Sequence, residues 1–252
     1  MRTAILIFLV LASTAEARPR AFAVGQKDQV TKGLVSYWSM RNSGTTVYDE
    51  WGGNNGAGNG VAFAYTNGVV GQGGSFDGVN DYVQVANDDS INFTGNFTVG
   101  AWVKFTQAQN NKGIVAKYTT GGTSRSWFLV VSQSGTSGRF SFVALPSNSW
   151  DANYMVTTTS QYNDGTWHYV TGVASMGNKN KIYVDGVLDG RSSYSLSEVV
   201  STESILSIGS QATLGACEFN GSIDEVRIYN RALSIDEIKQ LYRMGATIFN
   251  NR

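Results

Sequence analysis

The chain has 252 residues, of which 19 are basic and 19 acidic, so its formal net charge is zero. Nucleic acids and anionic membrane surfaces bind proteins that carry an excess of clustered positive charge, so neither is an expected partner. One Cys and one His exclude an internal disulfide and the zinc sites that need several nitrogen and sulfur ligands. A metal site here would have to use oxygen ligands.

The N-terminal segment predicts a secretion signal over residues 1–17. Arg2 gives a positive start, residues 5–11 are all apolar, and Ala15 and Ala17 are small residues suited to cleavage. The alternative is an uncleaved anchor, but an apolar run of about 10 residues is short for a bilayer span, which needs about 20. We therefore expect a secreted protein that is extracellular, periplasmic or at the cell surface, without membrane insertion.

The residues after the signal favour one all-β domain. Residues 18–32 are polar and aperiodic and are predicted to be a flexible lead-in, and residues 33–247 are predicted to be the domain. Gly is abundant, Pro is scarce, and β-branched and aromatic residues recur in short alternating bursts, which indicates many strands joined by tight turns. Strands are predicted around residues 34–40, 97–105, 114–118, 127–132, 139–145, 154–158, 167–174, 181–184, 205–209 and 223–229.

The clearest alternation lies in residues 97–105. One face carries Trp102, and the other is predicted to be core because all its side chains are apolar: Phe97, Val99, Ala101, Val103 and Phe105. A dozen or more strands in a chain of this length require two packed sheets. One helix is predicted over residues 234–244, where Ser234 and Glu237 form a capping box and Gly245 ends the apolar stripe.

Four segments together resemble the laminin-G-like jelly rolls, which share the concanavalin A-like fold with lectins and glucanases. They are residues 33–38 (GLVSYW), 75–83 (SFDGVNDYV), 97–104 (FTVGAWVK) and 221–234 (GSIDEVRIYNRALS). The resemblance extends over residues 33–245 and implies an all-β, two-sheet antiparallel jelly-roll sandwich with one short C-terminal helix. It also implies that calcium is often bound. It does not imply a ligand, because this fold serves enzymes, lectins and adhesion modules.

A structural calcium is the predicted cofactor. Asp224 shares strand parity with Val226 and Ile228, so we expect its carboxylate to point toward the apolar side, where an unpaired charge is costly. Calcium takes carboxylate and amide oxygens, and the loop that holds Asp49 and Asn54 resembles the family loop near this strand. The predicted metal ligands are Asp49, Asn54 and Asp224. The alternative is that Asp224 accepts backbone N–H groups and stabilises a turn.

No catalytic residue is predicted. Glycan-cutting enzymes of this fold need two carboxylates close together on one face, and Glu198 and Glu203 are five residues apart, which places them on opposite faces of a regular strand. A lyase reaction would need a base such as His168, but His168 lies in a stretch that resembles a structural strand of the family. We therefore expect a protein that is not an enzyme.

Aromatic residues near strand ends are the candidate ligand-binding residues, because a flat ring suits the apolar face of a sugar. The predicted ligand-binding residues are Trp127, Trp150, Tyr154, Trp102 and Arg125. Two alternatives stay open: Trp102 is covered by a loop, or Trp150 only anchors its own loop.

Three functions follow from these observations. The first is a secreted, non-catalytic module that binds carbohydrate or a glycoconjugate. The second is a surface module of the same fold that adheres to a protein. The third is a glycan-degrading enzyme, which the missing carboxylate pair disfavours.

Overall fold

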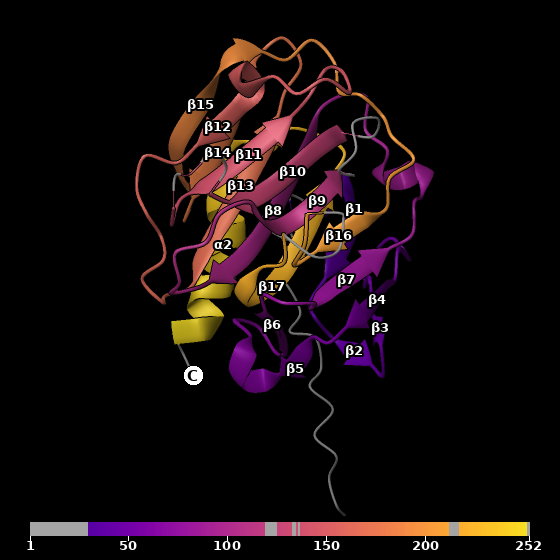
Figure 1. Cartoon of the computed structure of the whole chain (residues 1–252), viewed down its shortest axis with the longest axis vertical. Helices are drawn as coiled ribbons and strands as arrows, with labels where there is room; N and C mark the ends of the chain where they lie inside the picture. Colours follow the sequence, from indigo (N-terminus) through magenta and orange to yellow (C-terminus); the bar gives the residue numbers. More distant parts are fainter. Residues whose placement is uncertain (1–29, 119–124, 133–134, 136, 212–216, 251–252) are drawn as a thin grey trace, which may run out of the picture.

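The protein is described here by a computed structural model that covers residues 30–118, 125–132, 135, 137–211 and 217–250. Two antiparallel sheets of eight and nine strands pack face to face, and helix α2 (Ile235–Asn250) lies behind the strands in Figure 1. This arrangement confirms the predicted jelly-roll sandwich. The predicted signal, residues 1–17, lies outside the described residues, as does the predicted lead-in up to residue 29. None of the helices in the described ranges is both long and apolar enough to cross a membrane.

The eight-stranded sheet carries the helix. Its strand order is β15 (Val187–Ser195), β14 (Lys179–Val184), β13 (His168–Ala174), β8 (Phe97–Lys104), β17 (Asn220–Tyr229), β6 (Gly73–Asp77) and β5 (Ala62–Ala64), and β1 (Leu34–Trp38) also pairs with β17.

The nine-stranded sheet forms the other layer. Its order is β12 (Met155–Thr157), β11 (Phe140–Ala144), β10 (Arg125–Val131), β9 (Lys112–Tyr118), β16 (Leu206–Ile208), β7 (Tyr82–Val85), β4 (Gly56–Asn59), β3 (Thr46–Val47) and β2 (Asn42–Ser43). Short 3-10 turns within the described ranges are η1 (Tyr65–Asn67), η2 (Asp89–Ile91) and η4 (Ala152–Tyr154).

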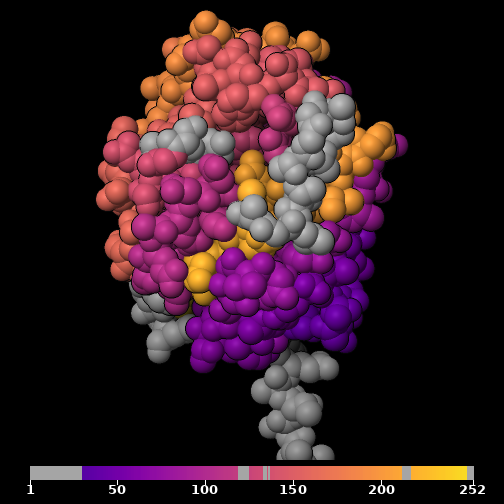
Figure 2. All heavy atoms as spheres, in the orientation of Figure 1, coloured from indigo at the N-terminus to yellow at the C-terminus, as the bar shows by residue number. Residues whose placement is uncertain are grey.

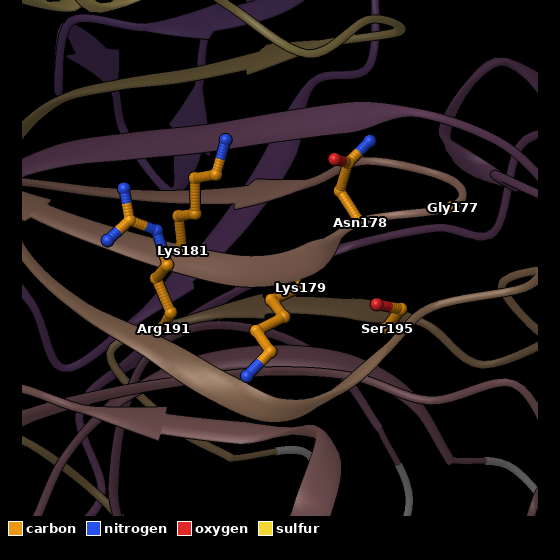
Figure 3. A pocket seen from close by; sticks show the side chains of 6 residues that line it. All are labelled: Gly177, Asn178, Lys179, Lys181, Arg191 and Ser195. Carbon is orange, nitrogen blue, oxygen red and sulfur yellow. The ribbon is translucent and has the colours of Figure 1, made fainter.

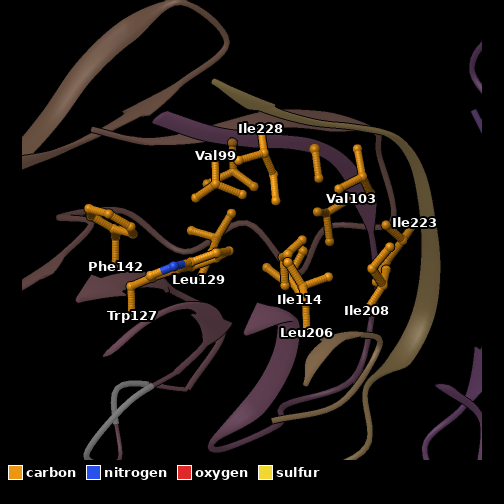
Figure 4. Close-up of a cluster of buried hydrophobic side chains, with 14 of the residues drawn as sticks. Val99, Val103, Ile114, Trp127, Leu129, Phe142, Leu206, Ile208, Ile223 and Ile228 are labelled. Atoms are coloured by element: carbon orange, nitrogen blue, oxygen red, sulfur yellow. The ribbon is translucent and has the colours of Figure 1, made fainter. Parts of the chain in front are cut away.

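The main core lies between the two sheets. Figure 4 shows Val99 and Ile228 of the eight-stranded sheet facing Trp127, Leu129 and Phe142 of the nine-stranded sheet. The predicted core face of residues 97–105 is confirmed, since each of its five apolar side chains is at most 3% exposed. Alternation of apolar residues with period two was sufficient to predict this face, because successive side chains of a strand point to opposite sides.

Helix α2 is longer than its sequence predicted. Gly245, the expected stop, lies inside the helix, and a Cβ atom added there would come within 2.4 Å of Nε1 of Trp102. The absent side chain lets the helix approach the sheet closely over Trp102. The glycine therefore serves close packing rather than termination.

The start of the domain also differs from its prediction. Val30 is buried, and its carbonyl accepts a hydrogen bond from the Tyr229 hydroxyl at 2.9 Å. The carbonyl of Lys32 accepts a hydrogen bond from Nε of Arg231 at 2.7 Å. Residues 30–32, which the sequence assigned to a flexible lead-in, are therefore attached to the end of β17 and belong to the domain.

A β-bulge interrupts the pairing of β17 with β8. The register shifts between Asp224 and Arg227, and Glu225 has a φ of 54°. Ile223 and Val226 both face the main core although they are three residues apart. A bulge places an extra residue in one strand and so reverses the parity beyond it. Asp224 therefore points away from the main core, and the expectation that it shares a face with Val226 is wrong.

Candidate aromatic binding site

Three of the predicted ligand-binding residues and two of their neighbours meet on the outer face of the nine-stranded sheet, at the end formed by β9 to β12. At the centre is Phe128 of β10, which pairs across the sheet with Ala116 and Val143 and points away from the main core. We call this group the aromatic cluster. Its members are Tyr118, Arg125, Phe128, Trp150 and Tyr154.

Trp150 and Tyr118 hold fixed positions against Phe128. The Trp150 ring stacks on the Phe128 ring with centroids 5.9 Å apart and planes at 10°, and the Tyr118 ring meets it edge-on at 5.3 Å. Phe128 is fully buried, whereas Trp150 and Tyr118 are partly exposed. Each of these two rings is packed against Phe128 and keeps part of its surface exposed. On the face seen in Figure 2, magenta and salmon segments form the left side and the part below the orange top edge.

A capped turn positions Trp150 and Tyr154. Oδ1 of Asp151 accepts hydrogen bonds from the backbone N–H and the side-chain amide of Asn153, both at 2.8 Å, which caps the 3-10 turn η4. The carbonyl of Tyr154 accepts a 2.7 Å hydrogen bond from the amide of Asn180 on β14. The two aromatic residues thus flank a polar turn that is anchored to the neighbouring sheet.

Arg125 adds a cation to the cluster. Its guanidinium carbon lies 5.7 Å from the centre of the Tyr118 ring, within the range of a cation–π contact. Its Nε–H is buried and has no hydrogen-bond partner among the described residues. An unpaired buried donor costs about 1–3 kcal/mol.

Trp127 does not belong to this site, which corrects its prediction. It is fully buried between the sheets, where its ring lies 5.3 Å from that of Phe97. Trp127 shares the core face of β10 with Leu129 and Val131, while Phe128 takes the outer face. Successive residues of a strand point to opposite sides, so Phe128 and not Trp127 lies on the outer face that carries the aromatic cluster.

Trp102 is also buried, and its prediction as a ligand platform is wrong. It lies on the outer face of the eight-stranded sheet, but helix α2 covers it. The Tyr242 ring of that helix stacks on it at 5.5 Å, and Tyr169 contacts it from β13 at the same distance. The alternative prediction, in which Trp102 is covered, is correct, but helix α2 covers it and not a loop.

The sequence did not point to the residue that joins the cluster together. Phe128 was not proposed, although its alternation with Trp127 and Leu129 marks it as outward-facing. Tyr194 of β15 was also missed: it is 52% exposed and meets Tyr154 edge-on at 5.8 Å. Only the pairing of distant strands brings these residues to one place.

The predicted calcium ligand Asp49 organises its own loop. Its carboxylate accepts four backbone N–H hydrogen bonds of 2.9–3.0 Å, from Tyr37, Trp51, Gly52 and Asn54. A carboxylate with four N–H donors has little capacity left for a cation.

Asn54 joins the same loop to β1. Its side-chain amide donates to the hydroxyls of Ser36 and Ser90, at 2.9 and 3.0 Å, and its backbone carbonyl accepts from Nε1 of Trp38 at 2.9 Å. The NH2 group and the backbone carbonyl of Asn54 therefore hold the loop in place.

Asp224 has a different set of partners. Its Oδ2 accepts the N–H groups of Val69 and Val70 at 2.7 and 2.9 Å, and its Oδ1 accepts that of Glu225 at 2.7 Å. Burial and the nearby Glu225 raise the pKa of Asp224, and the N–H donors oppose that rise. The alternative prediction, in which Asp224 accepts backbone amides, describes these contacts.

The three predicted ligands therefore do not fit a shared calcium ion in this arrangement. N–H groups occupy both acidic side chains, and no group of three or more acidic, His or Cys side chains suited to a metal occurs in the described part of the chain. Calcium binding itself stays an untested prediction. The reason for it, a buried carboxylate without partners, no longer applies.

We expect calcium and its removal to leave the thermal stability unchanged. The backbone donors around Asp49 and Asp224 already compensate the buried carboxylates, so we expect their loops to keep their stability when a chelator is added. The measurement is the melting midpoint of the protein with excess calcium and with a chelator. A midpoint raised several degrees by calcium, and not raised in Asp49→Asn, would show that this loop does bind the ion.

The only His is engaged in structural contacts. His168 Nδ1 lies 2.8 Å from Oδ2 of Asp185, and Nε2 lies 3.3 Å from Oδ1 of Asp164. Burial lowers the pKa of His168, but the bonds and charges of Asp185 and Asp164 outweigh it and the pKa is raised. The ring thus joins the start of β13 to the turn between β14 and β15.

A family model described as the concanavalin A-like lectin/glucanases superfamily matches residues 77–239. The match begins in β6 and ends in helix α2, so it contains the whole aromatic cluster. No curated protein sequence matches the chain.

Solved structures of low sequence identity have the same fold. The chain is similar to domain 4 of AbnA, a GH43 extracellular arabinanase from Geobacillus stearothermophilus in complex with arabinotriose, with a TM-score of 0.62, 19% identity, and 83% of this chain and 98% of that chain covered. It is similar to the binding domain of Paraclostridial Mosquitocidal Protein 1, with a TM-score of 0.64 and 16% identity, and 86% of this chain and 53% of that chain covered. It is also similar to Trypanosoma rangeli sialidase in complex with 2,3-difluorosialic acid, with a TM-score of 0.63 and 17% identity, and 86% of this chain and 33% of that chain covered. The chain therefore spans 53% of the mosquitocidal binding domain and 33% of the sialidase.

Proposed function

We propose, since the chain belongs to the concanavalin A-like lectin/glucanases superfamily, that it is a secreted, non-catalytic module that binds carbohydrate or a glycoconjugate through the aromatic cluster. The observation that carries the proposal is the stacking of partly exposed Trp150 on buried Phe128. A ring that is already held in place loses little conformational freedom on binding, which favours affinity.

The chemistry around Trp150 suits a sugar. Aromatic faces pack against the apolar face of a sugar ring, while amides, carboxylates and guanidinium groups bond its hydroxyls. Asp151, Asn153 and Arg125 supply these polar groups next to Trp150 and Tyr118. The complex of the arabinanase domain with arabinotriose supports carbohydrate as a ligand class for this fold.

The non-catalytic part of the proposal rests on the contacts of two buried carboxylates and of the His. Glycoside hydrolysis needs two carboxylates that face one site. Asp224 and Asp49 face backbone donors, and His168 bridges Asp164 and Asp185. Each of these three side chains holds a loop or turn in place through its hydrogen bonds. Secretion is proposed from the signal-like residues 1–17.

We expect Trp150→Ala to weaken glycan binding by about 10- to 100-fold, the usual loss when a central aromatic contact is removed. A glycan array on the mature protein identifies the ligand, and calorimetry then measures the dissociation constant. Because Trp150 is on the surface side of Phe128, its loss should change the free energy of unfolding much less than the loss of a core residue.

Trp51→Ala is the matched control, because Trp51 is 51% exposed and lies on the loop between β3 and β4, outside the aromatic cluster. Equal losses in both variants would contradict the proposed site. A silent array together with specific capture of an extracellular protein would indicate an adhesion module instead. Release of reducing ends or unsaturated sugars from a polysaccharide would show that the protein is an enzyme.

A further inference from the structure

Two cations lie directly opposite each other at one end of the eight-stranded sheet. Lys181 of β14 pairs in register with Arg191 of β15, and Lys179 pairs with Ser195. These residues line a surface depression of about 290 Å³ together with Gly177 and Asn178. In Figure 3 the head groups of Lys181 and Arg191 extend to the same side of the strands as the amide of Asn178, and the ammonium of Lys179 points away from them.

No carboxylate of the described ranges forms an ion pair with any of these three cations. The nearest acid in sequence, Asp189 of β15, has its carboxylate bonded elsewhere. Its Oδ1 accepts the N–H and hydroxyl of Thr159 at 2.8 and 2.5 Å, and its Oδ2 accepts the Tyr162 hydroxyl at 2.6 Å. The depression therefore keeps a local excess of positive charge in a protein whose net charge is zero.

Like charges directly opposite each other on neighbouring strands destabilise a sheet. One general explanation for such charges is protection of an edge strand against pairing with another chain. That explanation suits Arg191, since β15 is the edge of the sheet, but it does not suit Lys181, because β14 lies between β13 and β15. An anion bound between Lys181 and Arg191 would relieve the repulsion that the fold otherwise carries.

We propose that this depression is a second binding site, which takes a sulfate or carboxylate group of an acidic polysaccharide. The guanidinium of Arg191 presents paired donors that match such a group, and Lys181 adds a second positive charge. Asn178, whose NH2 group donates to Ser175 and Met176, supplies its amide oxygen, and Ser195 supplies a hydroxyl, for the sugar hydroxyls. A volume of about 290 Å³ is at the lower end of small-molecule sites and suits one charged sugar unit.

Two properties favour a polysaccharide over a membrane or nucleic acid. Only three basic residues line the depression, whereas nucleic acids are bound by contacts to about 6–10 phosphates and anionic membranes by clusters of about 4–8 basic residues. The neighbouring polar groups are neutral hydrogen-bonding groups. The site does not depend on the aromatic cluster, so the two proposals can fail separately.

The test compares dextran sulfate, polygalacturonate and neutral dextran as ligands of the mature protein in calorimetric titrations at low and high salt. We expect at least one of the two anionic polymers to bind, neutral dextran not to bind at this site, and binding to weaken as salt rises. In Lys181→Gln/Arg191→Gln, the dissociation constant should rise at least tenfold. Lys181→Arg should bind like the unchanged protein.

Lys32→Gln is the control for charge alone, because Lys32 is exposed and lies beside β1, away from β14 and β15 in the strand order. It should bind the anionic polymer normally. The double variant should melt no lower than the unchanged protein, since it removes a repulsion. The proposal is overturned if neither anionic polymer binds, if Lys32→Gln loses as much affinity as the double variant, or if vesicles with phosphatidylserine bind more tightly than both polymers.

Discussion

Replacing Arg227 by Met is expected to lower the free energy of unfolding by about 3–5 kcal/mol, the usual cost of removing one partner from a buried ion pair. Arg227 and Glu225 are each less than 10% exposed, and Nη2 of Arg227 lies 2.5 Å from Oε2 of Glu225. The Tyr37 hydroxyl donates to Oε1 of Glu225, and the centre of the Tyr37 ring lies 4.1 Å from the guanidinium carbon of Arg227. Without Arg227, the carboxylate of Glu225 stays buried with no positive charge beside it.

Denaturant unfolding measures this loss, and the slope of the transition shows whether the unfolded state has changed as well. The matched control is Glu225→Gln/Arg227→Met, which removes both charges. It should recover a large part of the lost stability, because a neutral pair avoids the cost of a buried unpaired charge. A single variant that loses less than about 1 kcal/mol would show that water reaches this pair, as it does in surface ion pairs.

Trp127→Ala is the second substitution with a large expected effect, about 3–5 kcal/mol of destabilisation. The ring fills the space between the sheets against Phe97, and its removal leaves a cavity among fully buried side chains. Any loss of glycan binding in this variant should follow the loss of folded protein. Thermal melting and binding measured on the same sample separate the two effects.

Trp127→Phe is the control for this substitution. Nε1 of Trp127 is buried and has no hydrogen-bond partner among the described residues, so Phe removes an unsatisfied donor and keeps most of the ring volume. We expect a loss well below that of Trp127→Ala. If Trp127→Ala instead bound glycan weakly while melting normally, the assignment of Trp127 to the core would be wrong.

The alternation of residues within a strand could not predict which outward-facing side chains are buried by another element that packs on the sheet. Trp102 alternates with core residues and therefore reads as outward-facing, which is correct for the sheet. The sequence also predicted a C-terminal helix, but nothing in either segment indicates that the helix packs on Trp102. That contact depends on Gly245, where a missing side chain permits close approach between residues about 140 positions apart.

The polar residues were harder to predict than the apolar ones. Parity placed Asp224 on the side of Val226, and the bulge at Glu225 reversed it. A local insertion of one residue leaves little trace in the hydrophobic pattern, yet it moves a charge from one face of the sheet to the other. The calcium prediction depended on that charge being uncompensated.

The sequence by itself determined the fold class, the strands and the main core, because side chains of a strand alternate between its faces and the apolar set must be buried. It also named Trp150, Tyr154 and Arg125, which meet in the aromatic cluster. Only the tertiary structure decided that Phe128 holds this cluster together, that Trp127 and Trp102 are buried, and that Lys181 faces Arg191. Those facts depend on strand register, a bulge and a helix that covers one sheet, and each of these is set by contacts between distant parts of the chain.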